Sequence, residues 1–143
     1  MTDGSGYRRD DLQKLAEAKL LDASLLADNE RYSNAYYLAG YAVELGLKAC
    51  IARQFRAETI PDPKLVQRLY THRLTELIGL AGLTAALNEE LAADRIFAAN
   101  WSTATEWTEN SRYEMIDKYS CQLMIEAVRD EKHGVLRWLK QHW

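Results

Sequence analysis

Two charged residues lie within an otherwise apolar stretch of the chain. Glu44 and Lys48 are four residues apart in the segment 35–53 (AYYLAGYAVELGLKACIAR), with the glutamate first. In a helix this order places the acidic and the basic side chain on one face, where they attract each other. A carboxylate buried there needs a cation, because an unpaired charge is very costly away from water. The pair predicts either a structural ion pair or the centre of a polar site.

Other polar residues can join this pair. His72 stands in the run Tyr-Thr-His-Arg-Leu, and Arg112 precedes Tyr113 near the start of the last helical pattern. We expect Arg112 to neutralise Glu44 across the helices. The predicted polar cluster is Glu44, Lys48, His72, Arg112 and Tyr113. It either fixes the register of the helices or lines a cleft, and a capping role for His72 is an alternative to a chemical one.

Metal and cofactor chemistry has little support in the sequence. There is no CxxC, no HExxH, no glycine-rich phosphate loop and no serine-elbow motif. The three histidines, His72, His133 and His142, do not share the i, i+3 or i+4 spacing of a helical ligand pair. We therefore predict neither a metal site nor a bound cofactor.

The composition is that of an ordinary globular protein. The chain has 143 residues, is 48% hydrophobic and 27% charged, and carries a net charge of −3. This balance excludes a uniformly basic nucleic-acid binder but leaves room for a local basic patch. No long apolar run predicts a membrane span, and residues 1–9 read as a flexible tail without a signal-peptide core. We expect a cytoplasmic protein in which Cys50 and Cys121 are buried, reduced thiols.

The pattern of apolar residues predicts a single all-α domain over residues 1–143. Both prolines lie in the loop 58–64, and no segment alternates as a strand would. Helices are expected over 10–27, 32–57, 62–69, 71–80, 84–99 and 111–140. The first two are joined by a short turn and must therefore be antiparallel neighbours.

Three local signals refine this outline. Asp62 and Pro63 have the form of an N-cap followed by proline at the first helical position. Segment 100–110 (NWSTATEWTEN) is polar and is expected to be an ordered connection. Ser111 and Glu114 have the spacing of a capping box that would start the last helix, and Gly134 marks a possible bend in it.

Aromatic residues offer two further alternatives. A small-ligand or nucleotide sensor would need an enclosed pocket, for which the candidates are Tyr36, Tyr37, Tyr41 and Trp107. Base stacking would use exposed rings, for which the candidates are Trp101, Trp107, Tyr113 and Tyr119. Packing in the core is the competing interpretation for all of them.

Four motifs in order give the chain a family resemblance. AYYLAGYAVELGLKA, THRLTELI, WSTATEWTENSRYE and VLRWLKQ together resemble the HEPN family of small prokaryotic helical domains, over residues 10–140. The resemblance implies an up-and-down bundle of four to five helices, often a homodimer. Many HEPN proteins are metal-independent endoribonucleases of toxin–antitoxin or defence systems, some encoded beside a nucleotidyltransferase. Others are noncatalytic RNA-binding or interaction modules.

The chain departs from the catalytic pattern of that family. Catalytic members carry an arginine, four to six residues, and then a histidine near the last long helix. Arg112 stands at the expected place in the order of motifs, but residues 117–119 are Asp, Lys and Tyr. Arg129 and His133 have the right residue types with only three residues between them, and an i, i+4 pair would share a helix face. They are the alternative catalytic candidates.

The sequence therefore predicts a HEPN-like module that associates with RNA or with a protein partner, in a toxin–antitoxin or defence setting. We expect a homodimer, a possible nucleotidyltransferase or RNA partner, no membrane, and no standard ribonuclease site. The alternatives are a metal-independent endoribonuclease with a divergent site, and a nucleotide or small-ligand sensor.

Overall fold

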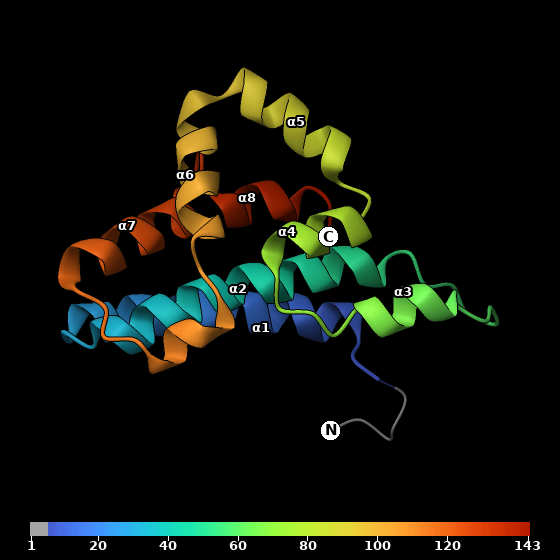
Figure 1. Ribbon diagram of the computed structural model, residues 1–143, viewed down its shortest axis with the longest axis horizontal. Helices are drawn as coiled ribbons and strands as arrows, with labels where there is room; N and C mark the ends of the chain where they lie inside the picture. The colour runs from blue at the N-terminus through green and yellow to red at the C-terminus, as the bar shows by residue number, and fades with distance from the viewer. Residues whose placement is uncertain (1–5) are drawn as a thin grey trace.

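The computed structural model describes residues 6–143, and all regular structure in that range is helical. These residues form eight α-helices and one short 3₁₀ helix, and Figure 1 shows how the helices are arranged. Their bounds are α1 Arg9–Asp28, α2 Tyr32–Ala52, α3 Pro63–Arg68, α4 Leu74–Leu80, α5 Thr84–Ala93, α6 Arg95–Thr105, η1 Glu109–Tyr113, α7 Lys118–Arg129 and α8 Val135–Lys140. The all-α class is confirmed. No helix among the described residues combines the length and the apolar character needed to cross a membrane.

The two long helices α1 and α2 form the base of the molecule (Figure 1). They are antiparallel and pack along their length, as their short connection predicts. Small residues line their contact: Ala16 and Ala23 on α1, and Ala35 and Ala39 on α2, are fully buried. The bounds of α1 match the prediction to within one residue at each end. Helix α2 ends at Ala52, five residues earlier than predicted.

The remaining helices cover this pair. Helix α7 packs against both α1 and α2, α8 continues onto α2, and α4 packs against the same helix. Helix α6 crosses α7 steeply, with α5 outside it, and α3 lies toward one end of α2 (Figure 1). A cap from Asp62 to the amide of Lys64, followed by Pro63, starts α3 as predicted. The first five residues of the expected tail lie outside the described range.

An aromatic cluster joins α6 to α8 and corrects one prediction. The ring centroids of Phe97 and Trp138 are 5.5 Å apart, and those of Trp101 and Trp138 are 6.4 Å apart. Phe97, Trp101 and Ala104 are buried at helical spacing, and this stripe makes residues 100–105 part of α6. The prediction of a connection over 100–110 is therefore wrong for its first half. Of the polar residues that suggested it, Ser102 is exposed, whereas Asn100 is half-buried and donates to the carbonyl of His133.

Two aspartates break helices that were predicted to be continuous. Asp94 has an extended backbone, and its carboxylate accepts the amides of Ile96 and Phe97, so that the predicted helix 84–99 becomes α5 and α6. Asp130 accepts the amides of Lys132 and His133 after α7 has ended, which separates α7 from α8. Both act as local caps that compete with helix continuation.

The predicted capping box does not form. Ser111 lies inside η1, where its hydroxyl is buried and has no hydrogen-bond partner among the described residues. Helix α7 begins instead at Lys118, where Asp117 caps it by accepting the amide of Ser120. Cys50 and Cys121 are buried free thiols, as expected, and burial raises the pKa of Cys50 to about 12.

One glycine permits an aromatic ring to lie directly on α2. A Cβ atom added at Gly40 would overlap the indole ring of Trp107, which is itself buried. The indole N–H donates to the carbonyl of Tyr37 at 3.2 Å, one turn earlier on α2. This contact fixes the chain after α6 against the middle of the long helix.

We expect Gly40→Ala to lower the free energy of unfolding by about 1–3 kcal/mol, because the added methyl forces the ring or the helix to move. Gly79→Ala is the matched control: its Cβ would meet no atom within 4 Å, and it lies in α4. There the gain in helix propensity should raise stability by about 0.5–1 kcal/mol. Urea denaturation followed by tryptophan fluorescence measures both. Equal effects of the two substitutions would contradict the close contact.

Candidate functional site: a buried glutamate and a polar pocket

Glu44 is a buried carboxylate with two nitrogen partners. Its side chain is 2% exposed, on the face of α2 that meets α4 and η1. Its Oε2 lies 3.2 Å from Lys48 Nζ, one turn further along the helix. Its Oε1 lies 2.9 Å from Nδ1 of His72, which immediately precedes Arg73 and helix α4. The site thus forms where the loop before α4 crosses the long helix.

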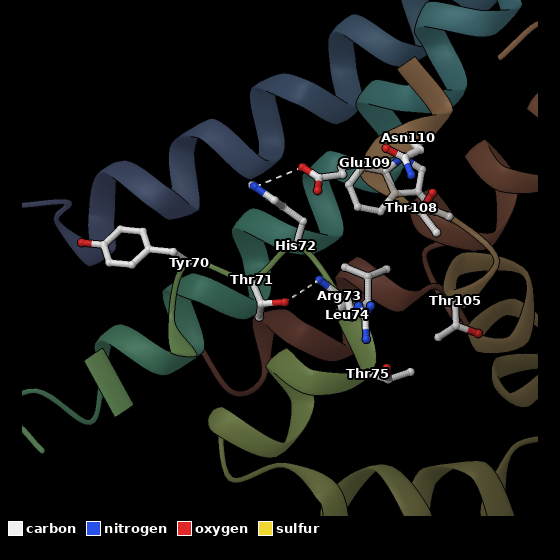
Figure 2. Close-up of a pocket in the computed structure, with 11 residues that line it drawn as sticks. Tyr70, Thr71, His72, Arg73, Leu74, Thr75, Thr105, Thr108, Glu109 and Asn110 are labelled. Carbon is white, nitrogen blue, oxygen red and sulfur yellow. Dashed lines mark hydrogen bonds and ion pairs between the residues drawn. The ribbon is translucent and has the colours of Figure 1, made fainter. Parts of the chain in front are cut away.

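His72 contacts a second carboxylate. Its Nε2 lies 3.2 Å from Oε2 of Glu109, the first residue of η1, as the dashed line in Figure 2 shows. Carboxylate oxygens only accept hydrogen bonds, and a neutral imidazole carries a single N–H. The contact with Glu44 has hydrogen-bond geometry, whereas the contact with Glu109 is a close approach of nitrogen and oxygen that becomes an ion pair when the ring is protonated. His72 thus lies between the carboxylate of Glu44 on α2 and that of Glu109 on η1.

A pocket of about 620 Å³ opens beside His72. Two stretches of chain form it, residues 70–75 on one side and residues 105 and 107–110 on the other (Figure 2). Leu74 and Trp107 supply buried apolar surface, while His72, Arg73 and Glu109 supply charged groups. The other lining residues are polar and neutral: Tyr70, Thr71, Thr75, Thr105, Thr108 and Asn110. This combination of an apolar surface and a few convergent polar groups is typical of ligand sites.

The structure brings together three of the five predicted cluster residues. Glu44, Lys48 and His72 are in contact, but Arg112 makes no ion pair with Glu44. The predicted pairing is wrong: η1 leaves Arg112 exposed, with its guanidinium 4.9 Å from the ring of the equally exposed Tyr113. His72 takes the place of Arg112 as the partner of Glu44 from another segment. Glu109 was missed, because nothing in its sequence neighbourhood marks it as facing a histidine.

Arg129 and His133 do not share a helix face. Helix α7 ends at Arg129, whose Nε donates to Glu126 at 2.9 Å, and His133 lies in the following turn. Nδ1 of His133 is 2.7 Å from Oδ2 of Asp94 at the start of α6. The expected i, i+4 geometry is therefore wrong, and each residue is held by a different carboxylate.

Three of the four residues proposed for a sensor pocket, Tyr37, Tyr41 and Trp107, lie close to one another. The ring of Tyr37 lies 5.9 Å from those of Tyr41 and Trp107, measured between centroids. Burial raises the pKa of Tyr36 and of Tyr41. Of these four, Trp107 alone lines the pocket beside His72. Among the base-stacking candidates, Trp101 is in the core, whereas Tyr113 and Tyr119 are exposed.

No group of three or more His, Cys, Asp or Glu side chains arranged to hold a metal ion occurs within residues 6–143. Comparisons of the chain with protein-family models, with curated proteins and with solved structures gave no match. Its candidate site therefore has to be interpreted from its own geometry.

We expect Glu44→Gln to lower the free energy of unfolding by about 1–3 kcal/mol, because the amide keeps only one of the two buried oxygens that face Lys48 and His72 and loses the negative charge. Glu126→Gln is the control, since it removes an exposed glutamate paired with Arg129 and should cost less than about 1 kcal/mol. Chemical denaturation of both variants tests this. A Glu44→Gln protein as stable as the control variant would show that the buried pairing contributes little.

A pH dependence follows from the contact between His133 and Asp94. The hydrogen bond from His133, assisted by the amides of Phe97 and Ile96, lowers the pKa of Asp94 from its ordinary value of 3.8. A carboxyl group with a lower pKa in the folded state stabilises the protein above its unfolded pKa. That contribution is lost as the pH falls through the folded value.

We therefore expect Asp94→Asn to lower the melting temperature at about pH 6, and the difference from the unmodified protein to shrink below pH 3.8. Thermal unfolding across this pH range measures it. Asp22→Asn, which removes an exposed aspartate on α1, should show no such convergence. A difference for Asp94→Asn that stays constant with pH would refute the role of its charge.

Proposed function

We propose that this chain is a HEPN-like helical module that binds single-stranded RNA through a basic segment beside the His72 pocket. The segment comprises residues 53–73, between the end of α2 and the start of α4. Its concentration of unpaired positive charge is the observation that carries the proposal.

Charge is distributed unevenly along the chain. Residues 53–73 hold five basic and two acidic residues, although the chain as a whole has a net charge of −3. The basic residues are all exposed: Arg53, Arg56, Lys64, Arg68 and Arg73. Arg56, Lys64 and Arg68 make no ion pair with any described residue, whereas Arg73 lies 3.5 Å from Glu76. Free, exposed cations of this kind attract the phosphates of a nucleic acid.

The segment also offers an aromatic surface next to the pocket. Tyr70 is 68% exposed, and Figure 2 shows its ring at the edge of the pocket, directed away from Glu109. A solvent-exposed ring beside positive charges is a platform on which an unpaired base can stack. Phosphate contacts along α3 and a base on Tyr70 would together favour a single strand, whose bases are free to turn outward.

The HEPN-like assignment rests on the order of the sequence motifs and is compatible with the helical arrangement. Long antiparallel helices α1 and α2, with α7 packed on both, suit an up-and-down bundle of four to five main helices. A homodimer, a nucleotidyltransferase partner, a cytoplasmic location and a toxin–antitoxin or defence setting come with that assignment. The engagement of Arg129 by Glu126 and of His133 by Asp94 favours a binding module over a ribonuclease at that position.

We expect the triple substitution of Arg56, Lys64 and Arg68 by Gln to weaken binding of a fluorescent single-stranded RNA. The slope of log affinity against log salt should fall by about 2, if each side chain neutralises one phosphate. Fluorescence anisotropy at several salt concentrations measures both quantities.

The control triple variant replaces Arg31, Arg95 and Lys132 by Gln. These residues are also exposed, make no ion pair among the described residues and lie outside the segment. The control has the same net charge as the test variant, so general electrostatics affects both equally. Equal loss of affinity in the two variants, or no RNA binding by the unmodified protein, would overturn the proposal.

A further inference from the structure

We propose that the pocket beside His72 binds an unpaired guanine base, with the carboxylate of Glu109 accepting its N1–H and its amino group. This inference rests on the proposed RNA-binding function and specifies which nucleotide the pocket selects. Two observations support it: the size and lining of the pocket, and the contacts that position the carboxylate of Glu109.

The pocket is suitable for one nucleotide in size and in character. Its volume of about 620 Å³ lies within the range of small-molecule sites. Trp107 and Leu74 form an apolar and largely buried part of its wall, and Asn110 provides an amide that can contact a base carbonyl. Arg73 at the same pocket and the free cations of residues 53–73 supply positive charge for the phosphate.

A row of charged groups holds Glu109 in place. Lys48 contacts buried Glu44, Glu44 contacts Nδ1 of His72, and Nε2 of His72 contacts Oε2 of Glu109. Glu109 remains 39% exposed, and its Oε1 accepts no hydrogen bond from the described residues. A carboxylate has about four lone-pair directions, so it can keep His72 and still accept two further donors. Lys48, Glu44 and His72 are therefore positioning residues for this carboxylate.

Guanine is the common base that matches such an acceptor. Its Watson–Crick edge carries two adjacent N–H donors, whereas the amino groups of adenine and cytosine each adjoin an acceptor nitrogen. Uracil has one N–H between two carbonyl acceptors. A guanidinium group offers the same pair of donors, but its positive charge would lie beside that of Arg73 at the same pocket. The charge of the pocket thus favours a neutral base attached to a phosphate.

The direct test measures the binding of nucleoside monophosphates to the full chain by calorimetry. GMP should bind about tenfold or more tightly than AMP, CMP or UMP, since each of these leaves donors or acceptors unmatched. IMP retains the N1–H but lacks the amino group, and should bind with intermediate affinity. Equal affinity for all five nucleotides would overturn the inference, as would free arginine binding more tightly than GMP.

Single substitutions test whether Glu109 is responsible for the preference for GMP. Glu109→Gln should abolish the preference for GMP over AMP, while Glu106→Gln, an exposed neighbour that does not line the pocket, should leave it unchanged. His72→Gln should lower the ratio of GMP to AMP affinity, because the carboxylate loses its anchor. A merely structural role of His72 would weaken both nucleotides alike and would refute the positioning chain.

The tests of guanine binding can fail independently of the tests of RNA binding. RNA binding that depends on Arg56, Lys64 and Arg68 but shows no preference for guanine would reject this inference and retain the RNA-binding module. Conversely, GMP binding without RNA binding would retain the pocket as a nucleotide site and reject the RNA-binding module.

Discussion

The carboxylate of Glu44 is the constraint on which the site depends. Its position among the small residues of α2 keeps it almost entirely from water, and such a group persists only with charged or hydrogen-bonding partners. Lys48 supplies one partner from the same helix, and His72 supplies the other from the loop before α4. The second contact determines where that loop crosses α2. It thereby places one wall of the pocket opposite η1.

The apolar pattern predicted the all-α fold class and the two long helices, because α1 and α2 bury alanine and leucine at helical spacing. Asp94 and Asp130 could not be recognised as breaks in the same way. Each lies within a run compatible with a helix, and each ends it only because its carboxylate caps the following amides. The contact between Asp94 and His133, 39 residues apart, adds support that no local pattern contains. The break at Asp94 is thus supported by a tertiary contact as well as by its local cap.

For the candidate site, the sequence predicted the need of Glu44 for a cation but not the identity of that cation. Arg112 has the longer reach and a permanent charge, and the motif order placed it near the last helix. However, η1 begins at Glu109 and carries Arg112 outward, so that Glu109 faces His72 in its place. The five-residue 3₁₀ helix η1 begins two residues after Trp107, whose indole ring is held on α2. The ring fits on α2 only because residue 40 is glycine.

The same contact connects the packing of the core with the proposed recognition of RNA. Trp107 is both the ring that lies on Gly40 and an apolar wall of the pocket, and Glu109 follows it by two residues. A displacement of the ring would therefore move the carboxylate relative to His72. The basic segment 53–73 depends much less on this packing, since α3 contains no buried residue. Attraction of phosphates and selection of a base would then be separable properties, the first set by exposed charge and the second by the rigidity of the core.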